Sequence, residues 1–112
     1  MGHKVLRKHP DMVPMMIKPD KCFYSNLRPA AAEQARALLL TGKFAAPRQW
    51  SFSQLGQRLR ANVGLEAKHA MFMVVAGHVI PPACTQLGQL YDEHKTADGV
   101  MEITVGVEST FG

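Results

Sequence analysis

Long apolar runs are missing from this sequence. The best apolar stretch, Met71 to Ala76, is far shorter than the roughly 20 residues that a membrane-spanning helix needs. The first residues do not resemble a secretory signal either, because charged and histidine side chains interrupt any apolar region from His3 to His9. We therefore expect a cytoplasmic protein without a membrane span.

Cysteine is scarce. The two cysteines, Cys22 and Cys84, are too far apart in the chain to match the short ligand spacings of zinc sites. Isolated cysteines in a cytoplasmic protein are typical of reduced thiols rather than of a disulfide framework. We therefore expect two reduced thiols in a reducing compartment.

Catalytic and cofactor motifs are absent as well. The five histidines are scattered along the chain and form no metal-ligand pair four residues apart on a convincing helix. Cys84 and His94 could in principle act as nucleophile and base, but no feature of the sequence brings them together. The glycines form no phosphate-binding loop. The sequence therefore predicts no enzyme activity, no metal site and no cofactor.

Charge is present but uneven. The net charge is +4, basic residues gather near the start, and five of the nine acidic residues lie in the last quarter of the chain. This pattern suits an ordinary solvated surface, or a basic face that meets an acidic peptide or anionic lipid. No zinc-finger spacing, aromatic RNP strand or KH loop is present, so we expect no nucleic-acid partner.

Four segments have the pattern of strands. They are Asp11–Lys18, Lys43–Pro47, Ala70–Ala76 and Val100–Gly106. Pro14 predicts that its part of the first strand lies at an edge or a bulge, or has its amide side unpaired. The third segment is apolar throughout, which is typical of a buried strand, and the fourth alternates with a period of two.

Three segments have the pattern of helices, and His3–His9 could form a further short one that Pro10 ends. The first runs from Ser25 to Gly42, with Ser25 or Asn26 as its cap, a proline in its first turn and Gly42 as its stop. A second begins at Ser51 or Ser53 and carries one apolar stripe, formed by Phe52, Leu55, Leu59 and Val63. A short third helix covers Thr85 to Glu93.

This order of elements predicts an α+β fold in one domain, residues 1–112. A four-stranded mixed sheet with a helix packed across one face is the simplest arrangement. The ubiquitin-like β-grasp has that order. The last strand leads toward Phe111 and Gly112, whose carboxylate has no side chain to obstruct it. Whether a partner uses this end, or the chain merely stops there, is open from composition alone.

The segment from Val79 onward resembles the autophagy ubiquitin-like modifiers of the GABA-receptor-associated-protein type. Members of that family carry a Pro-Pro pair, a helix ending in LYxEHK, an Asp-Gly turn and a Glu-Ser/Asn-Thr-Phe-Gly end. The matching residues here are Pro81-Pro82, Leu90–Lys95, Asp98-Gly99 and Glu108–Gly112, and His9–Pro14 and Lys43–Pro47 resemble the family's first two strands. The resemblance implies a divergent member with a shortened N-terminus and a longer, helical segment between the first two strands.

The resemblance implies a non-catalytic modifier. A cysteine protease processes and delipidates such proteins, an activating enzyme adenylates the terminal glycine, and a conjugating enzyme transfers it to phosphatidylethanolamine on the autophagosomal membrane. Here Gly112 would be attached, Phe111 would assist recognition, and residues 107–112 would be a flexible conjugation tail.

The resemblance also implies binding of receptor peptides that carry an aromatic and an aliphatic anchor, added as a strand to the sheet. The first anchor pocket would comprise Val5, Pro14, Met16, Lys43, Ala45 and Val100. The second would comprise Phe44, Ala46, Pro47, Trp50 and Leu55. Ala45 and Ala46 stand where the family has large apolar residues, so weaker peptide binding is expected, and Trp50 fits a core residue equally well.

Two other classes remain. One is the sister autophagy modifier that is joined to a protein lysine and also lacks the first two helices. The other is a ubiquitin-fold interaction domain that is never conjugated.

Overall fold

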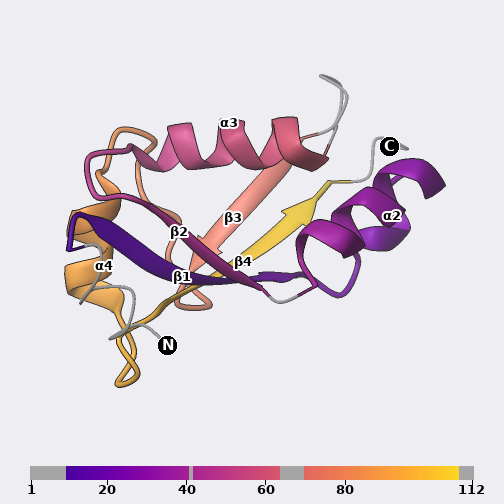
Figure 1. Ribbon diagram of the computed structural model, residues 1–112. Coiled ribbons are helices and arrows are strands. Elements are labelled where there is room, and N and C mark those ends of the chain that lie inside the picture. Colours follow the sequence, from indigo (N-terminus) through magenta and orange to yellow (C-terminus); the bar gives the residue numbers. More distant parts are fainter. Residues whose placement is uncertain (1–9, 41, 64–69, 109–112) are drawn as a thin grey trace.

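The computed structural model describes residues 10–40, 42–63 and 70–108 (Figure 1). Along the chain the elements are β1 (Met12–Pro19), the short 3₁₀ helix η1 (Tyr24–Asn26), α2 (Pro29–Leu38), β2 (Lys43–Pro47), α3 (Phe52–Val63), β3 (Met71–Val75), α4 (Leu87–His94) and β4 (Met101–Val107). The short helix expected at His3–His9 lies outside the described residues.

The strands form one mixed sheet in the order β2-β1-β4-β3. The two central strands, β1 and β4, are parallel, and each pairs with its outer neighbour in the antiparallel sense. Helix α3 runs across one face of this sheet (Figure 1). The predicted α+β, β-grasp architecture is therefore confirmed.

The core lies between α3 and the sheet. Val13, Met15 and Ile17 of β1 are buried on the face toward α3, and Met101, Ile103 and Val105 of β4 are buried in alternation with the more exposed Glu102 and Thr104. All four members of the apolar stripe on α3 are buried against them, as the helical spacing predicts. The helix begins with a capping box, because the Ser51 amide donates to Gln54 Oε1 (2.7 Å) and the Gln54 amide donates to Ser51 Oγ (3.2 Å).

Pro14 has the environment that was expected for it. It pairs with Ala45 on β2, whereas the pairing of β1 with β4 begins only at Met15. Its missing amide therefore costs no hydrogen bond to β4.

The first predicted helix is shorter than expected at both ends. Neither proposed cap acts as one, since the N-cap position is Arg28 and Asn26 Nδ2 instead donates to the Val107 carbonyl (2.7 Å). The helix ends at Leu38, before the predicted stop. Gly42 does adopt a left-handed conformation (φ +69°), but it turns the chain into β2 while its carbonyl accepts from the Ile17 amide (2.8 Å).

Helix α2 packs at one end of the domain beside the last turns of α3 (Figure 1). Gln34 Nε2 donates to the Asn62 carbonyl (2.6 Å), and the Arg36 guanidinium lies 4.6 Å from the centroid of the Tyr24 ring. The segment between β1 and β2 is thus a packed addition to the fold.

Strand β3 is not the fully buried strand that its apolar composition predicted. It is an outer strand of the sheet, and the Phe72 side chain is 37% exposed. Its ring covers Gly106 on β4, where a Cβ atom would lie 2.1 Å from Phe72 Cζ. A continuous apolar run gives no periodicity, so it could not distinguish an outer strand from an enclosed one.

No helix in the described ranges is long and apolar enough to cross a membrane. Within the same ranges, no three His, Cys, Asp or Glu side chains gather as metal ligands. Cys22 and Cys84 are both exposed thiols.

Candidate functional site

The outer edge of β2 is the natural place for an added peptide strand. β2 stands last in the sheet order, so one row of its backbone groups faces away from β1. Pro14 lies opposite Ala45, and Met16 lies opposite Lys43. Directly opposed residues of antiparallel strands share a face, so these four predicted members of the first anchor pocket lie on one side of the sheet.

A cavity of about 340 Å³ opens on that side, and we call it the Met16 cavity. Its lining is Met16, Lys18, Lys43, Thr96, Asp98, Val100 and Glu102. Three predicted pocket residues are among them: Met16, Lys43 and Val100. Pro14 is buried, Ala45 is exposed but does not line the cavity, and Val5 lies outside the described residues.

The charged wall of the Met16 cavity, formed by Lys18, Asp98 and Glu102 with Lys43, was not expected from the sequence apart from Lys43. Lys18 shares a face with Met16 through the period of β1, and Glu102 is the β4 partner of Met16. The first relation could have been read from the sequence, whereas the second required the pairing of β1 with β4.

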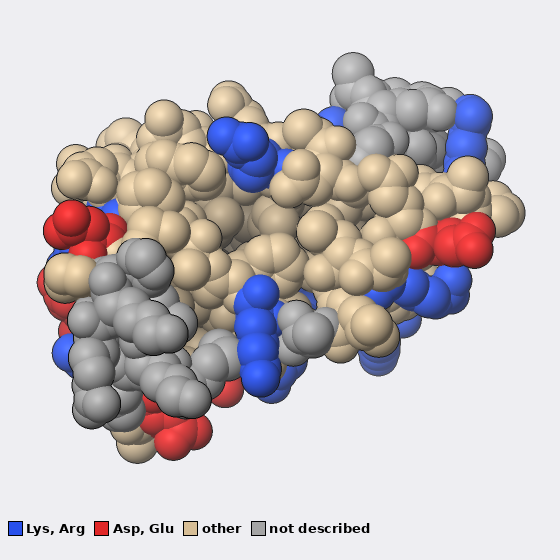
Figure 2. All heavy atoms as spheres, viewed as in Figure 1, with Lys and Arg blue, Asp and Glu red and all other residues tan. Residues whose placement is uncertain are grey.

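A second cavity, of about 420 Å³, lies along the outward face of α3, and we call it the Trp50 cavity. It is lined by Trp50, Gln54, Gln57, Arg58, Ala61 and Asn62. Viewed from this side, the surface over α3 and β2 is hollowed, with basic side chains above and below the hollow (Figure 2). The helical spacing of residues 54, 57, 58 and 61 was the signal in the sequence that could have identified this wall.

Among the residues predicted for the second anchor pocket, only Trp50 also lines the Trp50 cavity. Ala46 and Leu55 are only 3% and 4% exposed and belong to the core, so they cannot receive a ligand side chain as the structure stands. Phe44 and Pro47 are half-buried. Trp50 itself satisfies both readings left open by the sequence, because it packs against the core and also lines the cavity.

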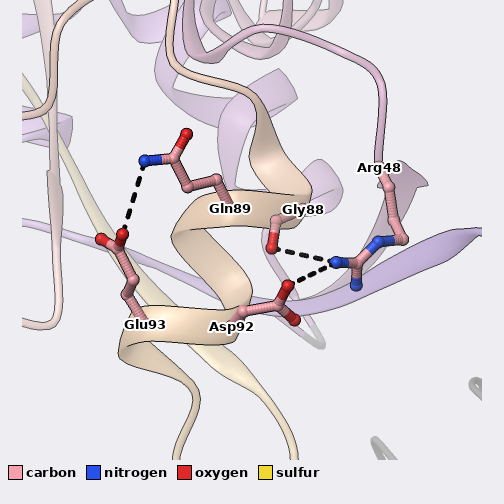
Figure 3. Close-up of polar contacts among 5 residues, drawn as sticks. All are labelled: Arg48, Gly88, Gln89, Asp92 and Glu93. Atoms are coloured by element: carbon pink, nitrogen blue, oxygen red, sulfur yellow. Dashed lines mark hydrogen bonds and ion pairs between the residues drawn. The ribbon is translucent and has the colours of Figure 1, made fainter.

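The end of β2 is tied to α4 through Arg48 (Figure 3). Arg48 Nη2 donates to Asp92 Oδ2 (2.7 Å) and to the Gly88 carbonyl (3.2 Å), and the Gly88 amide donates to the Arg48 carbonyl (3.0 Å). A Cβ at Gly88 would lie 2.9 Å from Arg48 Nε, so glycine is needed for this close approach. Asp92, a residue of the LYDEHK segment, thus helps to hold the end of β2.

The same segment also holds the turn before β4. Buried Tyr91 donates its hydroxyl to the Gly99 carbonyl (2.7 Å), and Lys95 Nζ lies 5.5 Å from the centroid of the Tyr91 ring. Burial, and secondarily the nearby Asp92 carboxylate, raises the pKa of Tyr91 above its usual value, while Arg48 opposes the shift. Tyr91 is therefore a neutral donor that fixes the Thr96–Gly99 turn.

Strand β4 leads toward the predicted attachment point. Val107 is buried within the strand, and the Glu108 amide still donates to the Ala70 carbonyl (2.8 Å), so the ordered strand includes the residue where we predicted the tail to begin. Phe111 and Gly112 lie outside the described residues.

Comparison with known proteins gives a consistent result. The family model described as autophagy protein Atg8, ubiquitin like, matches residues 1–112. Autophagy-related protein 8 of Schizosaccharomyces pombe is 28% identical over 112 residues, which is 99% of this chain and 82% of the relative. The protein of the same name from Colletotrichum lindemuthianum is 30% identical over 93 residues, covering 80% of this chain and 76% of the relative. Among solved structures, Trypanosoma brucei ATG8 superposes with a TM-score of 0.74 at 25% identity, covering 99% of this chain and 85% of that one.

Proposed function

Because this chain belongs to the Atg8 family of ubiquitin-like autophagy proteins, we propose that it is a modifier conjugated through Gly112 to phosphatidylethanolamine on autophagosomal membranes. It moves between the cytoplasm and that membrane, and while attached it presents its β2 edge to receptor peptides. The observation that carries the proposal is the family match over the whole chain, together with an ordered β4 that precedes the Thr110-Phe111-Gly112 motif.

The chemistry belongs to the partner enzymes. In the activating enzyme the Gly112 carboxylate attacks the α-phosphorus of ATP, which forms an acyl adenylate and releases pyrophosphate. A cysteine thiolate then displaces AMP to form a thioester, and a thiol of the conjugating enzyme takes over the acyl group by thioester exchange. The amine of phosphatidylethanolamine displaces that thiol and forms an amide. Gly112 suits these steps because it has no Cβ to obstruct a narrow enzyme channel. A cysteine protease of the pathway hydrolyses the final bond.

The body of the protein contributes a stable base for the tail. β4 pairs with β1 on one side and β3 on the other. Asn26 Nδ2 holds the Val107 carbonyl, and Glu108 pairs with Ala70. These contacts hold the chain in the sheet up to Glu108, so only a short segment separates the domain from the residues that the enzymes handle.

A reconstituted reaction tests the proposal. It contains ATP, the activating and conjugating enzymes and liposomes with phosphatidylethanolamine, and the product is followed by gel mobility and mass spectrometry. We expect a thioester and then a lipid adduct with the full chain, and neither with a Gly112 deletion. Gly112→Ala should also fail, and Phe111→Ala should be slower but still conjugated.

Urea unfolding provides the control, since all variants should match the parent stability. Conjugation of the Gly112 deletion at the parental rate, or a full chain that never forms a thioester, would contradict the proposal. Mass spectrometry of cell-derived protein, before and after lipid extraction, distinguishes the alternatives: a lysine-linked protein adduct identifies the sister modifier, and an unmodified chain identifies an interaction domain.

A further inference from the structure

The second anchor site of this chain does not have the chemistry of an aliphatic pocket. The two small or branched apolar residues expected in its wall, Ala46 and Leu55, are in the core. What lines the Trp50 cavity instead is one aromatic ring, one guanidinium, three side-chain amides and the methyl group of Ala61. An aliphatic side chain placed here would desolvate several polar groups without giving them partners, which is unfavourable.

Arg58 is held in position for an anion. It is exposed on α3, and its guanidinium carbon lies 5.4 Å from the centroid of the Trp50 ring. The face of the Trp50 ring attracts this cation and so favours its position beside the cavity. The planar fork of arginine matches the two oxygens of a carboxylate.

The amides add further donors. The side-chain oxygen of Gln54 already accepts from the Ser51 amide, so its amide nitrogen is the group left for a ligand. Gln57 and Asn62 are exposed, and each also carries a side-chain N–H₂ group. Asn62 keeps its side chain available because its contact with Gln34 uses the backbone carbonyl.

Acidic side chains are absent from this wall. None of the described residues that line the Trp50 cavity is Asp or Glu. The Met16 cavity differs, because Asp98 and Glu102 stand there beside Lys18 and Lys43. An anionic group on a bound peptide is therefore complementary to the Trp50 cavity and not to the Met16 cavity, and this difference sets the direction in which the peptide lies.

We propose that the Trp50 cavity binds an acidic side chain, most suitably glutamate, of a receptor peptide that pairs with β2. The inference rests on the proposed adaptor function and specifies its ligand class: an aromatic anchor for the Met16 cavity, followed by an acidic rather than an aliphatic anchor at the Trp50 cavity. The carboxylate pairs with Arg58, and the amides of Gln54 and Gln57 donate to its remaining lone pairs.

Three matched peptides test the inference on the full chain. They share a phenylalanine as the first anchor and differ only in the second anchor, which is Glu, Gln or Leu. Trp50 is the only tryptophan in the sequence, so its fluorescence, and its protection from a soluble quencher, report directly on this cavity when the peptides contain no tryptophan.

We expect the Glu peptide to bind roughly three- to tenfold more tightly than the Gln peptide at low salt, as for a partly screened ion pair reinforced by hydrogen bonds. The Leu peptide should bind no better than the Gln peptide. Added salt should reduce the difference in affinity between the Glu and Gln peptides, because it screens the ion pair. Arg58→Gln should remove the preference for Glu, whereas Arg36→Gln, which changes an arginine on α2 stacked on Tyr24, should retain it. Thermal unfolding of each variant verifies that it is folded.

The outcomes separate the two proposals. If the Leu peptide binds more tightly than the Glu peptide, or if Arg58→Gln keeps the preference for Glu, the acidic-anchor inference is overturned while the adaptor function stands. If none of the three peptides binds, the adaptor function is overturned and the inference falls with it. Tight binding of the Glu peptide without a change in Trp50 quenching also overturns the inference, because the acid then sits elsewhere.

Discussion

Replacing Leu55 by alanine tests whether this residue belongs to the core or to a peptide pocket. Leu55 is 4% exposed and stands in the middle of the buried stripe of α3, between Phe52 and Leu59. Removing a buried leucine side chain costs about 2–5 kcal/mol, from lost transfer free energy and the cavity left behind. The whole stability of a 112-residue domain is of the order of 6–17 kcal/mol. Leu55→Ala should therefore remove a large fraction of it.

Urea unfolding measures this loss. With a slope of about 1.5 kcal/mol per molar, the midpoint should fall by roughly 1–3 M. Gln57→Ala is the matched control on the same helix, because its side chain is exposed, and it should change stability by less than about 0.5 kcal/mol. Peptide affinity, measured in the absence of urea where the variant is still folded, should change little for Leu55→Ala.

The opposite pattern would refute the reasoning. If Leu55→Ala kept the parental midpoint and lost peptide binding, then Leu55 would line the pocket, and the assignment of the stripe to the core would be wrong. A large fall in the midpoint with unchanged affinity supports the structural assignment.

Two further predictions concern the contacts of α4. In a double-mutant cycle of Arg48→Ala and Asp92→Ala, the coupling free energy should be about 0.5–1 kcal/mol. It is modest because the two side chains are 33% and 57% exposed. If the two substitutions lower the stability in a purely additive way, the ion pair contributes nothing. Tyr91 has a raised pKa in the folded state, so its contribution to stability is complete below about pH 10 and is lost as the pH rises through the folded value. Tyr91→Phe should lower the free energy of unfolding by about 1 kcal/mol at neutral pH, because the hydrogen bond to Gly99 is lost. It should also reduce the fall in the free energy of unfolding at alkaline pH, measured by urea unfolding. An unchanged dependence on alkaline pH would contradict this account.

The sequence alone determined the elements whose pattern is periodic. The alternation on β4 and the spaced stripe on α3 predicted which residues are buried, because a buried face repeats every second residue in a strand and about every third or fourth in a helix. The proline expected in the first turn of the Ser25–Gly42 helix is the first residue of α2, although the helix begins later than the proposed caps Ser25 and Asn26 implied. The motifs around Tyr91 and Gly99 carried the resemblance to the ubiquitin-like autophagy proteins, the family to which the chain belongs.

Tertiary structure decided the features that depend on a partner distant in the chain. Asn26 was a good helix cap by local chemistry, but it bonds to Val107, a contact that exists only because β4 ends beside η1. Phe72 became exposed because β3 is an outer strand, which its composition did not reveal.

The proposed peptide site shows the same division. Met16, Lys43 and Val100, which the family resemblance implied for the first anchor pocket, line one cavity because neighbouring strands bring them together, whereas Pro14 and Ala45 do not line it. The resemblance implied Leu55 for a second pocket, but Leu55 is buried with the apolar stripe of α3, and the packing of that helix leaves Arg58 beside Trp50. Burial of a helix face is a property of its rotation against the sheet, so the chemistry of that cavity was set by packing and not by the order of residues alone.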